Sequence, residues 1–367
     1  MKLTTLALLL IPAVAVADEP VDRVHYPGGE GPGQGKHIVF LTGDEEYRSE
    51  ESQPMMARML SERFGFETTV LFAINRETGE IDPDQTDNLP GVAEVLPTAD
   101  LMVQFLRWRN LPDEQTGPII DYTNSGKPIL AIRTGTHPFK WREGDQTSYE
   151  RWGWNKGESG GGYGRDVLGE TWVTHYGKHN EESTLGLPAY QQSDHPILSG
   201  VEQVWDPGDV YGIKTDPERF EPILLGVILQ GMSPDDPPRP DRELVPVLWT
   251  REYEGETGNT SRVVTTTLGT AEGFENEGFR RAIVNSMFWL LDLDVPKKAD
   301  VEPIRTYEPL PSGFGGHRKG VFPKDLQGRV STAAADDAAA DEAAADDVAA
   351  DGETANGAAA TPSQSKN

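Results

Sequence analysis

Four short apolar runs in the first third of the chain alternate with segments whose apolar residues recur at helical spacing. Continuous apolar runs of this length are typical of strands buried on both faces, as in parallel sheets with helical connections. The alternation predicts an α/β fold: a mostly parallel sheet with helices on both faces. The predicted strands are residues 37–41, 68–72, 101–106 and 129–132.

Two helices are predicted between these strands. The first takes Ser52 as its cap and Pro54 in its first turn, where a proline removes no helical hydrogen bond. The second begins at Asp113 as a capping residue and ends near Gly126. The buried side of the first helix is formed by Met55, Met56, Met59, Leu60 and Phe64.

The regular alternation stops at residue 138. Residues 138–164 mix tryptophan, tyrosine, glycine and charged residues without a period, and such a long irregular segment usually covers or lines a site. We therefore expect a long loop-rich insertion over residues 138–208. Strand-rich segments follow at 210–213, 220–229, 245–250 and 262–267. The last amphipathic helix buries Phe279, Ile283, Met287 and Leu290.

Both ends of the chain are expected to lie outside the folded domain. Residues 1–17 have the basic start, apolar middle and small-residue end of a signal peptide, so we expect an exported protein, periplasmic or extracellular, without an integral membrane segment after cleavage. Residues 18–35 are expected to be a leader and residues 36–325 the α/β domain. Residues 331–367 repeat alanine and acidic residues and are expected to be a disordered acidic tail.

Charge and cysteine content exclude two classes of function. The formal net charge is −27, and the tail contributes only eight acidic residues and one lysine to it. A nucleic-acid partner is therefore not expected, because it would require a basic surface. The chain has no cysteine, so it forms no disulfide and cannot be a cysteine-dependent amidotransferase.

The turn after the fourth strand is the first candidate site, because ligands bind at the carboxyl ends of strands in open α/β sheets. Hydrolases place a nucleophile at such a turn, but this chain has Arg133 there. Arginine is not a base at neutral pH, yet it binds anions and polarises carbonyl groups. His137 is a candidate for proton transfer, with a structural histidine bonded to the backbone as the alternative.

The turns after the first and third strands carry further candidates. Asp44, Glu45 and Glu46 follow the first strand, where carboxylates serve as acid, base, metal ligand or sugar-hydroxyl acceptor. The alternative is a solvated loop paired with Arg48. Residues 107–109 follow the third strand and read Arg, Trp, Arg. A tryptophan face packs on a sugar ring while guanidinium groups bind hydroxyls or carboxylates; the alternative is an internal salt bridge from Arg107 or Arg109 to Asp44 or Glu46.

His175 and His179 are four residues apart, which would place both imidazoles on one face of a helix, where they could bind zinc. Gly177 lies between them and disfavours a helix. Three interpretations remain open: a divalent metal site, an acid–base or sugar-binding pair, and a surface loop. His195 and Asp209 are expected to anchor turns.

Eight segments in a fixed order resemble the trehalose-utilisation (ThuA-like) family, within the class I glutamine-amidotransferase-like superfamily, and in particular its secreted bacterial subgroup. They are residues 42–50, 107–112, 133–139, 167–172, 195–201, 209–212, 266–269 and 279–285. The resemblance implies a flavodoxin-like sheet and a role in sugar metabolism, with trehalose and related or oxidised disaccharides as the substrate class. The chain departs from the family at Arg133 and at Thr270, where many members have histidine.

The resulting hypothesis is an exported sugar-active protein that processes trehalose-like or oxidised (3-keto) disaccharides. The alternatives are a non-catalytic carbohydrate-binding module and, third, a metal-dependent hydrolase. No cofactor is expected, with a divalent metal as the open possibility. The expected catalytic residues are Glu46, Arg133, His137 and His175. The expected substrate-binding residues are Asp44, Arg107, Trp108, Arg109, Thr134 and His179.

Overall fold

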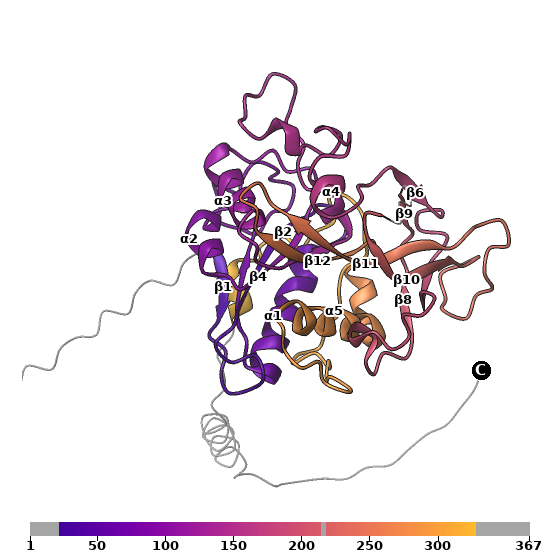
Figure 1. Cartoon of the computed structure of the whole chain (residues 1–367). Helices are drawn as coiled ribbons and strands as arrows, with labels where there is room; N and C mark the ends of the chain where they lie inside the picture. Colours follow the sequence, from indigo (N-terminus) through magenta and orange to yellow (C-terminus); the bar gives the residue numbers. More distant parts are fainter. Residues whose placement is uncertain (1–21, 214–217, 328–367) are drawn as a thin grey trace, which may run out of the picture. The chain divides into compact units, whose positions relative to one another are not determined.

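The computed structural model describes residues 22–213 and 218–327 (Figure 1). The predicted signal peptide and acidic tail lie outside the described residues, as do residues 18–21 of the predicted leader. Within the described ranges, no helix combines the length and the apolar character needed to cross a bilayer.

Ten strands of the described residues form one mixed sheet. In spatial order they are β1 (Arg23–Tyr26), β3 (Glu67–Leu71), β2 (His37–Gly43), β4 (Leu101–Leu106), β5 (Ile129–Ile132), β12 (Thr260–Thr266), β11 (Val245–Glu254), β10 (Glu221–Ile228), β7 (Thr184–Pro188) and β8 (Val204–Asp206). The run from β3 to β12 is parallel, and the remaining pairings are antiparallel. The predicted α/β class is confirmed, and the four apolar runs form the centre of the parallel part.

Alternate residues of the central strands face two separate cores. In β2, Ile38 and Phe40 pack into one core, and Val39 and Leu41 pack into the other. The first core lies against α1 (Ser49–Phe64) and α5 (Glu277–Leu290). The second lies against α2 (Val92–Val95), α3 (Asp113–Thr123) and α4 (Gly162–Val167). Because both faces are covered, these strands are largely apolar, which is why the sequence pattern identified them.

The starts of the first two predicted helices were placed incorrectly. Helix α1 begins at Ser49 because the backbone amides of Glu51 and Ser52 both bond to the carbonyl of Arg48, at 3.0 and 3.2 Å. Pro54 therefore lies inside the helix rather than in its first turn. Pro112 precedes α3, and its neighbour Asp113 makes no cap hydrogen bond.

The Asp113 carboxylate accepts hydrogen bonds from the loop-rich insertion instead. The Thr147 hydroxyl donates to it at 2.6 Å and the backbone amide of Ser148 at 3.0 Å. The acidic residue at the start of this helix thus makes tertiary hydrogen bonds, and the local sequence pattern does not distinguish such a residue from a helix cap.

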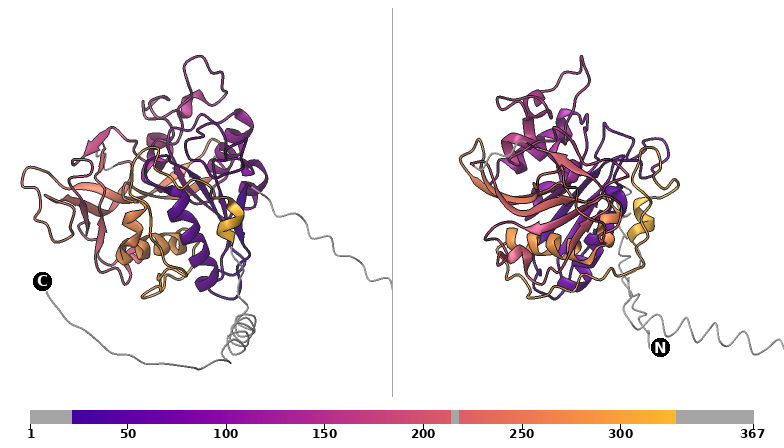
Figure 2. Two further views of the ribbon diagram at one scale, coloured as in Figure 1. Left: turned by 180° about the vertical axis from the view of Figure 1, so that it is seen from behind. Right: turned by 90° about the vertical axis from the view of Figure 1, so that its right-hand side faces the viewer.

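The sheet begins before the predicted domain boundary at residue 36. Strand β1 lies in the expected leader and pairs antiparallel with β3. The short helix α6 (Pro323–Gln327) lies beside β1, as Figure 2 shows. The Tyr26 hydroxyl donates to the carbonyl of Leu326 at 2.9 Å, so the two ends of the described chain are joined.

The insertion contains more strand than predicted. Its strands β7 and β8 extend the main sheet, while β6 (Thr174–Tyr176) pairs with β9 (Val210–Gly212) in a separate two-stranded sheet. The remainder consists of loops and short turns of helix, including the 3-10 turn Glu150–Trp152. The 3-10 turns Leu96–Thr98, Arg133–Thr136, Pro196–Leu198 and Glu272–Glu275 complete the assignment.

Candidate functional site

Polar and aromatic side chains gather beyond the carboxyl ends of β2, β4 and β5, next to β6 and β9. This group, called the strand-end cluster below, draws on turns that are distant in sequence but adjacent in the sheet. It contains Glu46, Arg107, Trp108, Arg133, His137, Trp172, His175, His179, Asp209 and Tyr211. All four residues expected to be catalytic lie in it.

Asp209 is the centre of the polar contacts. Its carboxylate is fully buried and lies 2.7 Å from Nδ1 of His175, 3.1 Å from Nδ1 of His179 and 3.5 Å from Nη2 of Arg133. Burial alone would raise the pKa of Asp209, but the hydrogen bonds to the two histidines and the charge of Arg133 outweigh it and lower the pKa to about 2. Asp209 is therefore ionised at neutral pH.

The two histidines meet at Asp209 without a helix. His175 lies in β6, and the chain then turns through Gly177, whose φ of 110° is a conformation that glycine adopts without strain. His175 remains 44% exposed and His179 33% exposed. As Gly177 indicated, the pair does not lie on a helix; a strand followed by a tight turn brings both rings to one carboxylate.

His179 also approaches the acidic loop after β2. Its Nε2 lies 3.7 Å from Oε1 of Glu46, whose other oxygen is 3.2 Å from Nε of Arg107. The hydrogen bond to Asp209 raises the pKa of His179, with Glu46 adding to the effect. Burial raises the pKa of Glu46, against the opposing charge of Arg107. The imidazolium form of His179 is thus favoured.

Asp44 and Thr134 fasten the turns to each other. The fully buried Asp44 carboxylate accepts the backbone amides of Glu46, at 2.8 Å, and Tyr47, at 2.5 Å, and a hydrogen bond from the Thr134 hydroxyl. The expectation of a solvated loop after β2 does not hold for Asp44. Its contacts connect the β2 turn to the β5 turn.

Glu45 is the main partner of the two arginines after β4. One of its carboxylate oxygens pairs with Arg107 and the other with Arg109. Arg109 is 1% exposed and also donates to the carbonyl of Pro83 at 2.9 Å. The alternative of an internal salt bridge is confirmed for Arg107, whose Nε lies 3.2 Å from Glu46, and Glu45 is an additional acid that both guanidinium groups reach.

Arg133 is fully buried at the start of the turn after β5. Its backbone φ of 47° is a left-handed conformation that is costly for an arginine, as at the nucleophile position of a strand-to-helix elbow. Its guanidinium donates to the carbonyl of Thr267 at 3.0 Å and lies 3.8 Å from the ring centre of Tyr47. The tight turn expected after the fourth strand is present at Arg133. The Arg133 side chain points into the protein, where Thr267, Tyr47 and Asp209 surround it.

His137 is enclosed by aromatic rings. Its ring centre lies 5.3 Å from that of Trp108, 5.7 Å from that of Trp172 and 5.5 Å from that of Tyr211. Burial, reinforced by the charges of Arg107 and Arg133, lowers the pKa of His137 well below its ordinary value. The imidazole is therefore neutral, and its Nδ1 pairs with the hydroxyl of the adjacent threonine at 3.0 Å.

Trp108 and Trp172 form the partly exposed aromatic surface of the cluster. Their rings meet edge to face at 5.7 Å, and the Trp172 ring lies 5.9 Å from that of His175. The Arg107 guanidinium stacks on Trp108 at 4.2 Å. Sequence analysis identified Trp108 but did not assign a role to Trp172, although Trp172 lies in one of the segments that carried the family resemblance.

The cluster also has the composition of a metal site. Ligand atoms of His175, His179 and Asp209 lie within 4.8 Å of one another. Two imidazoles and a carboxylate are ligands that Zn²⁺ accepts. By contrast, the hollow of about 410 Å³ between α1 and residues 304–308 is lined by Met55, Tyr307 and other residues without a histidine.

Comparisons with known proteins match the fold weakly. No family model and no curated protein matches the chain. A solved structure from Bacteroides uniformis ATCC 8492, described as ThuA-like, is 12% identical with a TM-score of 0.43 and covers 71% of this chain and 93% of its own. Another so described, from Parabacteroides merdae ATCC 43184, is 12% identical with a TM-score of 0.42 and covers 72% of this chain and 99% of its own. Likeness at this level carries no inference about activity.

Proposed function

We propose that this chain is an exported enzyme of the ThuA-like kind that acts on a disaccharide, either trehalose-like or oxidised to a ketone at C3. The observation that carries the proposal is the exposed imidazole of His175, oriented by the buried, ionised Asp209 and adjacent to Trp172. The ordered segment resemblance supports the substrate class. Export rests on the predicted signal peptide.

Asp209 makes His175 a base and His179 an acid. A carboxylate that accepts Nδ1–H fixes the tautomer and presents Nε2 as the proton acceptor. His179 makes the same contact, and its raised pKa favours the protonated form. The two rings are 5.7 Å apart, so one substrate can meet both.

A 3-keto disaccharide suits this pair. The ketone acidifies the C2 proton, which His175 removes. The C2–H electron pair then forms the C1=C2 double bond as the C1–O bond breaks. The departing oxygen keeps the electron pair of the C1–O bond and accepts a proton from His179. Arg107, 11% exposed, is the cation available to the developing oxygen charge.

The aromatic surface supplies the binding face. Trp172 offers a ring face for the C–H groups of a sugar. Trp108 completes the aromatic surface with Arg107 stacked on it, and two nitrogens of that guanidinium already pair with Glu45 and Glu46. The sugar therefore packs beside His175.

Four residues expected at the ligand become positioning residues in this proposal. Their side chains are at most 1% exposed and already bonded to protein groups, so they hold the turns and Asp209 rather than touch substrate. They are Asp44, Arg109, Arg133 and Thr134.

The test is turnover of trehalose and of 3-keto disaccharides by the purified protein. His175→Ala should abolish turnover, while His195→Ala, which removes a histidine next to Trp289 and outside the cluster, should retain it. Saturable sugar binding without turnover over a broad panel supports the carbohydrate-binding module instead. Equal activity of His175→Ala and the wild type would refute the proposal.

A metal-dependent hydrolase is the second candidate, favoured by the juxtaposition of His175, His179 and Asp209. In that case the imidazole nitrogens are ligands and the activity requires Zn²⁺ or a similar cation. Turnover that disappears on chelation and returns with ZnCl₂ selects the hydrolase; turnover in the presence of chelator selects the acid–base pair.

A further inference from the structure

A second group of side chains of the types that can ligate a metal lies at the opposite end of the central strands. His37 and Glu67 are the first residues of β2 and β3 and are paired in register, and His25 lies in the edge strand β1. Strand β2 is seven residues long, which places this group roughly 20 Å from the strand-end cluster. The proposed catalytic residues do not use it.

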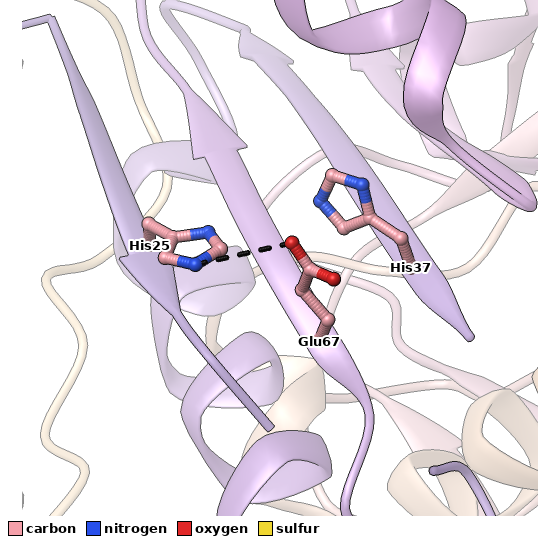
Figure 3. Close-up of side chains that lie close together, drawn as sticks. All are labelled: His25, His37 and Glu67. Carbon is pink, nitrogen blue, oxygen red and sulfur yellow. Dashed lines mark ion pairs between the residues drawn. The ribbon is translucent and has the colours of Figure 1, made fainter. Parts of the chain in front are cut away.

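The three side chains point toward one another on one face of the sheet. Figure 3 shows the Glu67 carboxylate between the two imidazoles. Nε2 of His25 is 3.9 Å from Oε1 of Glu67, and one ligand atom from each residue lies within 4.8 Å of the others. The residues also line a hollow of about 380 Å³ together with Glu94 and Gln327, so there is space for an ion.

Hydrogen bonds fix which nitrogen of His37 is available. The Thr98 hydroxyl donates to the carbonyl of Val95 at 2.7 Å, so its oxygen accepts from Nδ1–H of His37 at 2.9 Å. Neutral His37 therefore has its lone pair on Nε2, to which the Thr69 hydroxyl donates at 2.9 Å. A histidine whose Nδ1–H is anchored and whose Nε2 faces a carboxylate has the arrangement of a metal ligand.

His25 is arranged in the same way. Its Nδ1 pairs with the Thr69 hydroxyl at 3.0 Å, which leaves Nε2 directed to Glu67. Because Thr69 donates to His37, it accepts from Nδ1–H of His25, so both rings are set with Nε2 toward the carboxylate. The side chains of His25 and Glu67 are 41% and 45% exposed, so an ion has access from solvent.

We propose that His25, His37 and Glu67 bind one divalent transition-metal cation of the zinc type, through Nε2, Nε2 and a carboxylate oxygen. Ligand bonds of about 2.0–2.2 Å in a tetrahedral site place ligand atoms about 3.3–3.6 Å apart, so the 3.9 Å separation contracts by roughly half an ångström and any wider separation, up to 4.8 Å, by more, through side-chain rotation. Water from solvent completes a tetrahedral site. The ion joins three neighbouring strands and fastens the edge strand β1 to the sheet.

The experiment is a ZnCl₂ titration of chelator-stripped protein followed by NMR of the histidine ring nitrogens. A His175→Ala/His179→Ala background removes the other histidine pair. One equivalent of Zn²⁺ should shift the Nε2 signals of His25 and His37 and raise the midpoint temperature of unfolding. Since His25 and Glu67 are part-exposed, His25→Ala and Glu67→Gln should keep the fold and lose zinc affinity at least tenfold.

Thr98→Val tests the orienting contact separately. It leaves all three ligands in place, and loss of such a contact typically costs about 10–100-fold in metal affinity. His195→Ala is the matched control and should bind zinc like the background protein. Zinc affinity unchanged in His25→Ala and Glu67→Gln, or no shift of the two ring signals at millimolar ZnCl₂, would overturn the proposal. In the protein that keeps His175 and His179, disaccharide turnover should be unaffected by His25→Ala, so the two proposals fail independently.

Discussion

Replacing Asp209 by asparagine removes one buried charge and almost no volume, so it isolates the electrostatic role of this carboxylate. Its pKa of about 2 lies below the ordinary 3.8. At about 1.4 kcal/mol per pKa unit, that gap corresponds to roughly 2.5 kcal/mol of stability at neutral pH. The variant also leaves Arg133 buried with less negative charge beside it, which adds to the loss.

The pH dependence follows from the direction of the shift. Because the folded-state pKa of Asp209 is depressed, the unfolded chain binds a proton between about pH 4 and pH 2 that the folded protein does not. The contribution is fully present above pH 4 and is lost as the pH falls through about 2. The raised pKa of His179 also depends on Asp209, and its contribution to stability is present below about pH 6.5 and is lost as the pH rises. The stability difference between wild type and Asp209→Asn should therefore be at least as large at pH 5 as at pH 7, and smaller at pH 3 than at pH 5.

Urea unfolding at pH 7, 5 and 3 measures this difference from the midpoint and slope of each transition. Asp121→Asn is the matched control, because Asp121 is exposed and should contribute less than about 0.5 kcal/mol. The reasoning is refuted if Asp209→Asn costs no more than Asp121→Asn at pH 7, or if its cost does not decrease at pH 3.

Three further outcomes are expected. The hydrogen bond to Asp209 raises the pKa of His179, so the protonated form of His179 persists above pH 6.5. The alkaline limb of kcat/KM against pH should therefore lie above 6.5. An alkaline limb below that value contradicts the assignment of His179 as the acid. Trp172→Ala should raise KM for the disaccharide several-fold with little change in kcat, since ring stacking contributes about 1 kcal/mol; an unchanged KM removes Trp172 from the binding face. Gly164→Ala should destabilise by about 1–3 kcal/mol in urea unfolding, because its new Cβ would lie 2.0 Å from the carbonyl of Thr136, while Gly29→Ala, with open space around it, should be neutral.

The parallel part of the sheet could be predicted because its signal is local. Strands β4 and β5 have the predicted bounds, and a run buried on both faces needs no knowledge of its partners. Strands β1, β7 and β8 were missed because they are short and lie toward the edges of the sheet, where β1 is defined by pairing with β3, β7 by pairing with β10 and β8 by pairing with β7. Their sequences are rich in polar or turn-forming residues, so only the tertiary context identifies them.

The prediction that the candidate residues converge agrees with the structure, and their roles in function stay predictions. The rule that strand ends converge correctly brought Glu46, Arg107 and Arg133 into one region. Burial is what the sequence did not reveal: whether an arginine after a strand faces solvent or protein depends on segments far along the chain. Arg133 was expected at the ligand for this reason, and it contacts Thr267 and Asp209 instead.

Asp209 was expected to anchor a turn, and the structure gives it a further role beside Arg133. Because the Arg133 side chain is fully buried, its charge requires a buried carboxylate nearby. Asp209 precedes a valine in one of the segments that resemble the ThuA-like family, and it pairs with Arg133 while both side chains are fully buried. The same carboxylate orients two part-exposed histidines. Because the charge of Arg133 acts on Asp209, Arg133→Met should alter activity through Asp209. Its main effect should be a change in the pH profile of activity rather than in KM.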